Sequence, residues 1–69
     1  MTNVQAMRIL IALQEKNGLV PDGVIGPRTA SLYVDANSDE REALCIVVSL
    51  SKVERKAAFL NAREVRDLP

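Results

Sequence analysis

The sequence contains no histidine, so the side chain most often used for proton transfer near neutral pH is missing. A single cysteine, Cys45, leaves no internal disulfide and too few thiolates for a structural zinc site. Tryptophan is absent, and Tyr33 and Phe59 are the only aromatic residues, so the core must be aliphatic. The apolar run Ala43–Val48 around Cys45 predicts a small buried or half-buried hydrophobic side chain there and not a reactive thiol.

An excess of charge is also missing. Nine basic and nine acidic residues give a formal net charge of zero, whereas nucleic-acid-binding domains usually carry a basic excess. No run approaches the roughly 18 apolar residues of a membrane span. Residues 1–5 lack the basic and apolar regions of a signal peptide. The sequence therefore predicts neither a nucleic-acid partner nor a membrane partner, and no signal peptide in this chain.

The 69 residues suffice for one domain, spanning residues 1–69. A domain near this size buries only about 60% of the surface that its unfolded chain exposes, so its stability should be marginal. Because 48% of the residues are hydrophobic, a small core is possible without disulfides or metal ions.

Apolar residues recur at helical spacing near the start of the chain and predict a helix over residues 3–16. Thr2 and Gln5 form a capping-box pattern at its start, and Gly18 is expected to end it. The apolar face is wide, so we expect it to make contacts on two sides. It comprises Val4, Ala6, Met7, Ile9, Leu10, Ile11 and Leu13.

The next segment predicts a structured loop followed by a short helix. Residues 21–23, Pro-Asp-Gly, spell a tight turn, since proline presets φ and glycine permits a positive φ. Gly26 is expected at the N-cap and Pro27 at the first position of a helix over residues 27–34. Ile25 is expected to anchor the loop in the core.

A long helix is predicted over residues 40–66, capped by Asp39 with Glu42 as its partner. Residues 49–51, Ser-Leu-Ser, interrupt it, and Ser51 forms a second capping-box pattern with Glu54. Two alternatives therefore stay open, a continuous or bent helix and a break near Ser51. The apolar seam of the long helix comprises Ala43, Ile46, Leu50, Val53, Ala57 and Leu60.

The expected fold is all-α, a small three-helix bundle with a turn-rich loop between its first two helices. A continuous third helix would extend about 40 Å against about 21 Å for the first, so its far end would lack a partner. That end would need a fold-back, a second copy or a missing domain. The expected core is Leu10, Leu13, Ile25, Leu32, Val47 and Leu50, and the apolar end is Phe59, Leu60, Val65 and Leu68.

Catalytic patterns are missing as well. The acidic residues fall at turns, at caps or on the polar sides of helices, and no spacing brings two carboxylates into one cleft. There is no phosphate-binding loop, dinucleotide fingerprint or nucleophile elbow. The interpretation is that this chain alone is not an enzyme and that it requires no cofactor and no metal ion.

The segment Asp22–Thr29 carries the strongest local pattern. A turn, an apolar anchor, a glycine cap and a proline start explain most of it structurally. The start of the following helix also presents free N–H groups beside Arg28, where a carboxylate or a carbonyl could dock. A purely structural role and a structural role with ligand contact both stay open.

These eight residues, Asp-Gly-Val-Ile-Gly-Pro-Arg-Thr, resemble the Asp-Gly-x-apolar-Gly-Pro-x-Thr signature of peptidoglycan-binding domains. The resemblance includes the family's first helix and covers about residues 4–36. Ala43–Cys45 and Arg55–Leu60 resemble the C-terminal helix of one subgroup, the predicted peptidoglycan domain that follows the catalytic domain of phage-type lysozyme-like muramidases. The end at residues 66–69 looks like a truncation before that subgroup's final aromatic segment.

The resemblance implies a three-helix module that binds peptidoglycan, by its peptide stem or its glycan, without cutting it. It implies a place in an endolysin or another murein hydrolase, acting in the cell wall or periplasm as part of a larger or phage-delivered protein. Arg28 and Tyr33 are added as exposed neighbours of the signature. The candidate ligand residues are then Asp22, Gly23, Ile25, Gly26, Arg28, Thr29 and Tyr33.

Other functions stay open. A helical protein–protein or oligomerisation module would use the apolar face of the 40–66 helix. It would dock on the catalytic domain of a parent protein or on a second copy through Phe59, Leu60 and Val65. A wall-binding fold recruited for phage structure or regulation is a third interpretation.

Overall fold

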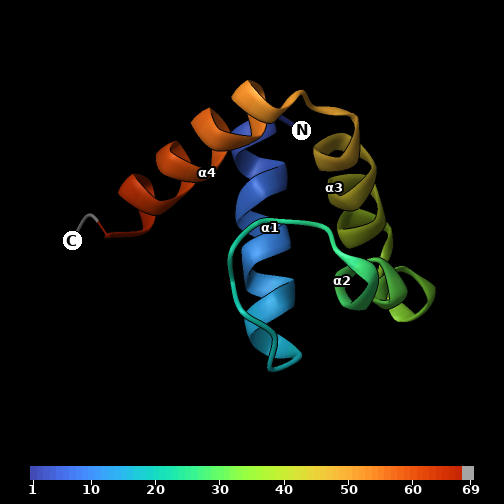
Figure 1. Ribbon diagram of the computed structural model, residues 1–69. Coiled ribbons are helices and arrows are strands. Elements are labelled where there is room, and N and C mark those ends of the chain that lie inside the picture. The colour runs from blue at the N-terminus through green and yellow to red at the C-terminus, as the bar shows by residue number, and fades with distance from the viewer. Residues whose placement is uncertain (68–69) are drawn as a thin grey trace.

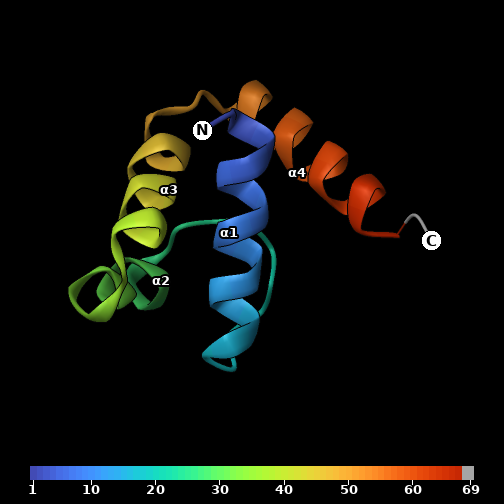
Figure 2. The same ribbon diagram turned by 180° about the vertical axis from the view of Figure 1, so that it is seen from behind.

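The computed structural model describes the backbone of residues 1–67 and the side chains of residues 1–63, and this part of the chain is helical without strands. Helix α1 lies in the middle, with α3 on one side and α4 on the other (Figures 1 and 2). The short α2 and the 3-10 turn η1 lie beside the start of α3. The elements are α1 (Asn3–Lys16), α2 (Pro27–Ser31), η1 (Leu32–Asp35), α3 (Ser38–Ser49) and α4 (Lys52–Asp67).

Helix α1 begins and ends where the sequence predicts. The Gln5 backbone N–H donates to Thr2 Oγ1 at 3.1 Å, and the Thr2 N–H donates to Gln5 Oε1 at 2.8 Å. This reciprocal pair satisfies two of the N–H groups that a helix start leaves unpaired. Gly18 follows the helix with a φ of 71°, the left-handed conformation that glycine adopts without a Cβ penalty.

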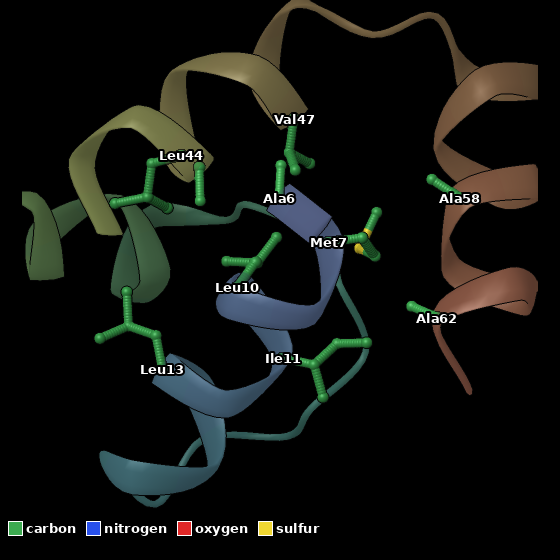
Figure 3. Close-up of a cluster of buried hydrophobic side chains, with 10 residues drawn as sticks. Ala6, Met7, Leu10, Ile11, Leu13, Leu44, Val47, Ala58 and Ala62 are labelled. Atoms are coloured by element: carbon green, nitrogen blue, oxygen red, sulfur yellow. The ribbon is translucent and has the colours of Figure 1, made fainter. Parts of the chain in front are cut away.

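The wide apolar face of α1 makes contacts on two sides, as expected. In Figure 3, Leu10 and Leu13 point toward α3, whereas Met7 and Ile11 point toward α4. The facing residues on α4 are alanines one helical turn apart, which allow the two helices to approach closely. The buried partners are Ala43, Leu44 and Val47 on α3 and Ala58 and Ala62 on α4.

The long C-terminal helix is broken, so the prediction of one continuous helix over residues 40–66 is wrong and its stated alternative is confirmed. Leu50 is extended, with a ψ of 148°, and α4 begins at Lys52. Glu54 N–H donates to Ser51 Oγ at 3.2 Å, and Ser51 N–H donates to Glu54 Oε1 at 2.9 Å. The break directs α4 back along the free side of α1.

Helix α3 begins earlier than predicted, and its cap is Asn37 instead of Asp39. Glu40 N–H donates to Asn37 Oδ1 at 2.8 Å, and Asn37 N–H donates to Glu40 Oε1 at 2.9 Å. Asparagine and aspartate are equally good N-caps, and each of Asn37 and Asp39 has a glutamate three residues later. The helix begins at the earlier of the two caps, so that Asp39 lies in its first turn. Lys16 at the end of α1 pairs with Glu40 at 3.1 Å and joins the two helices.

The expected core is confirmed in part. Leu10, Leu13 and Val47 are buried, while Ile25, Leu32 and Leu50 are half-buried against them. The predicted seam of the long helix does not continue past the break, because α4 packs on α1 through other residues than those of the seam. Val53 is 78% exposed and Leu60 is 51% exposed, whereas Ala58 and Ala62 are buried.

Two further expectations need correction. Cys45 is exposed, because its position on α3 lies on the side away from α1. Phe59 is half-buried against the core and is not part of an unpartnered end. The side chains of Val65 and Leu68 lie outside the described residues.

Candidate functional site

Gln14 fixes the loop between α1 and α2. Its side chain is only 1% exposed, and Gly23 N–H donates to its Oε1 at 3.0 Å. Its Nε2 donates toward Val24 O and Thr29 Oγ1, each at 3.1 Å, and lies 3.3 Å from Asp22 Oδ1. One buried amide therefore connects α1 to both ends of the Asp22–Thr29 segment.

Sequence reasoning missed Gln14. The signal was available, because Gln14 follows Leu10 by four residues and Ile11 by three and so lies on the apolar face of α1. A glutamine at such a position is buried, and a buried amide needs hydrogen-bond partners. In this chain the turn supplies them.

Asp22 and Gly23 have structural roles in the turn. Val24 N–H donates to Asp22 Oδ1 at 3.0 Å, a local bond by which aspartate stabilises turns. Gly23 is buried with a φ of 69°, and an added Cβ would lie 2.7 Å from both Met7 Sδ and Phe59 Cδ1. Only glycine allows the loop to approach α1 and α4 this closely.

Gly26 and Pro27 start α2 as predicted. Gly26 is the N-cap with extended backbone, φ −92° and ψ −173°, and Pro27 is the first helical residue. Ile25 is half-buried against the core, and Thr29 is only 5% exposed beneath the loop. Ile25 and Thr29 therefore point inward. Their burial in the folded chain is enough to account for these two signature residues without a ligand contact.

A hollow of about 520 Å³, open to solvent, lies along the outer side of this loop. We call it the loop hollow. It brings together Asp22, Gly26, Arg28 and Thr29 of the candidate residues, and the exposed side chains of Val20 and Val24 add apolar surface. Its lining consists of Gly18, Leu19, Val20, Asp22, Val24, Gly26, Pro27, Arg28 and Thr29.

The start of α2 contributes few donors to this hollow. The helix has five residues, and Pro27 has no N–H at its first position. Because the helix is so short, few peptide dipoles add along its axis, and the partial positive charge at its N-terminus is small. Any anion bound here would therefore depend mainly on the exposed side chain of Arg28.

Tyr33 and Ile25 lie apart from the loop hollow. Both line a smaller apolar hollow of about 190 Å³ between α2, η1 and α3. The Arg41 guanidinium lies 5.1 Å from the centre of the Tyr33 ring, and its Nε donates to Tyr33 O at 3.0 Å. Arg41 thus holds Tyr33 against α3, and the structure does not place Tyr33 beside Arg28.

Within residues 1–63, no cluster of three histidine, cysteine, aspartate or glutamate side chains could hold a metal ion. None of the helices in the described part of the chain has the length and apolarity needed to cross a membrane. Comparison with protein-family models, with curated proteins and with solved structures finds no match for this chain.

Proposed function

We propose that this chain is a non-catalytic module that binds peptidoglycan, with the loop hollow around Arg28 as its ligand surface. The observation that supports the proposal is the shape of the signature loop. Gln14 holds its inner side through Gly23, Val24 and Thr29. These bonds tie the loop to α1, and its outer side presents a cation beside apolar surface.

The hollow fits weak recognition of a carboxylate-bearing polymer. Arg28 supplies charge-assisted hydrogen bonds to a carboxylate, and Val20 and Val24 supply apolar contact. The open hollow has no aromatic residue in its lining, so a single site should bind with a dissociation constant on the order of 100 µM, or about −5.5 kcal/mol. Many sites on a polymeric wall would raise the apparent affinity by avidity.

Such a module would act in the cell wall or periplasm, within an endolysin or another murein hydrolase that supplies the catalytic domain. Weak binding suits this arrangement, because an enzyme that cuts a polymer must leave one site to reach the next.

Co-sedimentation with purified sacculi tests the proposal. We expect wild type to sediment, and Arg28→Ala to lower the binding constant about three- to fivefold, since an exposed charge pair contributes up to about 1 kcal/mol. Arg8→Ala is the matched control, because Arg8 is an exposed arginine of α1 that lines a different hollow. Added salt should weaken the binding of wild type.

Two results would contradict the proposal. Wild type that fails to sediment with sacculi of several chemotypes would exclude wall binding. Equal losses in Arg28→Ala and Arg8→Ala would show that binding depends on overall charge and not on the loop hollow. Helical circular dichroism of each variant must match that of wild type, so that unfolding cannot explain a loss.

A second candidate function is docking on another protein through α4. Val53, Ala57 and Leu60 are exposed and follow one another by four and three residues, which places them on one side of the helix. In the parent protein this stripe would pack on the catalytic domain, where the covalent link allows a contact too small to hold separate molecules together. Changes in the α4 amide NMR signals on fusion to the catalytic domain that Leu60→Gln abolishes would support it.

A further inference from the structure

Figures 1 and 2 show that α4 diverges from α1 toward its C-terminal end. A second hollow is lined by residues of α1, the loop and α4. We call it the α1–α4 hollow. Its volume of about 560 Å³ is within the range of about 300–1,000 Å³ that is common for small-ligand pockets. Its lining consists of Ile11 and Glu15 from α1, Val20, Pro21 and Asp22 from the loop, and Phe59 and Arg63 from α4.

The walls of this hollow carry opposite charges. Arg63 lies on the α4 side, with its guanidinium 5.5 Å from the centre of the Phe59 ring. Asp22 lies on the loop side, where Gln14 and Val24 N–H hold its Oδ1. Asp22 and Arg63, both among the described side chains, do not form an ion pair with each other. Arg63 and Asp22 are thus held on separate walls by separate contacts, and Glu15 of α1 adds a second acid to the lining.

Apolar surface also lines the hollow. The exposed Val20 and Pro21 and the half-buried Phe59 contribute to it, and the Arg63 guanidinium lies over the Phe59 ring. The Arg63 guanidinium covers this face of the Phe59 ring, so the face is not free to pack against the C–H groups of a sugar. The hollow is therefore poorly suited to a neutral glycan.

We infer that the α1–α4 hollow binds a short zwitterionic peptide, with Arg63 on its carboxylate, Asp22 on its ammonium group, and the apolar wall on small side chains such as alanine. The inference rests on the proposed function and deepens it, because the peptide stem of peptidoglycan combines carboxylates, the amine of a diamino acid and alanines. The loop hollow and the α1–α4 hollow share Val20 and Asp22, so the two sites are adjacent.

An amide-detected NMR titration tests this inference with two soluble probes. One probe is the pentapeptide L-Ala-D-Glu-L-Lys-D-Ala-D-Ala, and the other is a neutral N-acetylglucosamine tetrasaccharide. We expect the pentapeptide to shift the amide signals of Ile11, Asp22, Phe59 and Arg63, and the tetrasaccharide to leave them in place.

Variants of α4 separate the hollow from general charge. Arg63→Gln should weaken pentapeptide binding about five- to tenfold. Lys52→Gln removes the same charge from the other end of α4, about 16 Å along the helix, and should bind like wild type. A pentapeptide with an amidated C-terminus and blocked amines should lose most of the affinity. Equal affinity of Arg63→Gln and wild type would overturn the inference.

Sacculi stripped of their peptides by an amidase distinguish this inference from the proposed function. Binding to intact but not to stripped sacculi supports both. Equal binding to intact and stripped sacculi overturns peptide recognition and leaves wall binding standing. Pentapeptide binding without sedimentation on any sacculi overturns wall binding and retains the hollow as a peptide site. Absence of binding in every experiment overturns both.

Discussion

Phe59 of α4 lies directly against Gly23 of the loop, so that a Cβ added to Gly23 would come within 2.7 Å of Phe59 Cδ1. These residues are 36 positions apart in the sequence. Their contact connects the loop, which carries the family-like signature, to the helix that the break near Ser51 folds back. The shape of the candidate site therefore depends on how α4 packs.

Gly23→Ala should destabilise the protein by about 2–4 kcal/mol, because it combines a left-handed φ with overpacking against Met7 and Phe59. Gly18→Ala is the matched control. Its φ of +71° is similar, but no atom lies within 4 Å of the added Cβ, so it should lose only about 1–2 kcal/mol. Urea unfolding measures both. Equal losses would mean that Phe59 does not press on the loop.

Gln14→Met should destabilise the protein by about 2–3 kcal/mol. Methionine has a similar shape but leaves Gly23 N–H and Thr29 Oγ1 without their buried partner. A double-mutant cycle with Thr29→Val separates the two bonds, and we expect a coupling above about 0.5 kcal/mol. Additive losses would show that the bond between Gln14 and Thr29 contributes nothing.

Gly26 should tolerate substitution, unlike Gly23. Its backbone is extended, and no atom lies within 4 Å of an added Cβ. Serine can also accept a hydrogen bond at the N-cap, so Gly26→Ser should change stability by less than about 0.5 kcal/mol. Gly26→Val should lose no more than about 1 kcal/mol, because valine cannot cap. A large loss in Gly26→Ser would contradict the cap assignment.

Acid should weaken the junction between α1 and α3. The backbone N–H of Asn37, and then Lys16, hold the pKa of Glu40 below its ordinary value of 4.5. A lowered pKa in the folded state means that the stabilisation is present above about pH 4.5 and is lost as the pH falls through the folded value. Thermal melts from pH 7 to pH 3 should fall less steeply in Glu40→Gln, which keeps a capping side chain but cannot titrate.

The sequence predicted the helix ends that depend only on residues next to them in the chain. Thr2 with Gln5 placed the start of α1, and Pro27 after Gly26 placed the start of α2. Near Ser51 two local signals competed, since the apolar seam favoured one helix and the capping box favoured two. Only the packing of Ala58 and Ala62 on the second face of α1 decides between them, and that contact is not local.

The candidate site was predicted less completely than the fold. The signature predicted the loop that borders the loop hollow, but the sequence alone could not separate inward residues such as Thr29 from outward ones such as Arg28. Gln14 makes that separation, because its bonds turn one side of the loop toward α1. The α1–α4 hollow was missed altogether, because it forms only when α4 folds back and brings Arg63 near the loop.

The exposed apolar surface of α4 is too small to drive self-association. A continuous helix would have left Phe59 and Leu60 together at an unpartnered end and would have favoured self-association. The break buries part of Phe59 in the core and leaves a narrow stripe of Val53, Ala57 and Leu60. A stable interface needs about 800 Å² from each partner, which three side chains on one helix do not supply. We therefore expect light scattering to show a monomer from about 10 µM to about 500 µM, in the range where weak dimers would appear. A concentration-dependent mass that Leu60→Gln abolishes, and that the control Val34→Gln at an exposed position outside α4 does not, would establish α4 as a self-association face instead.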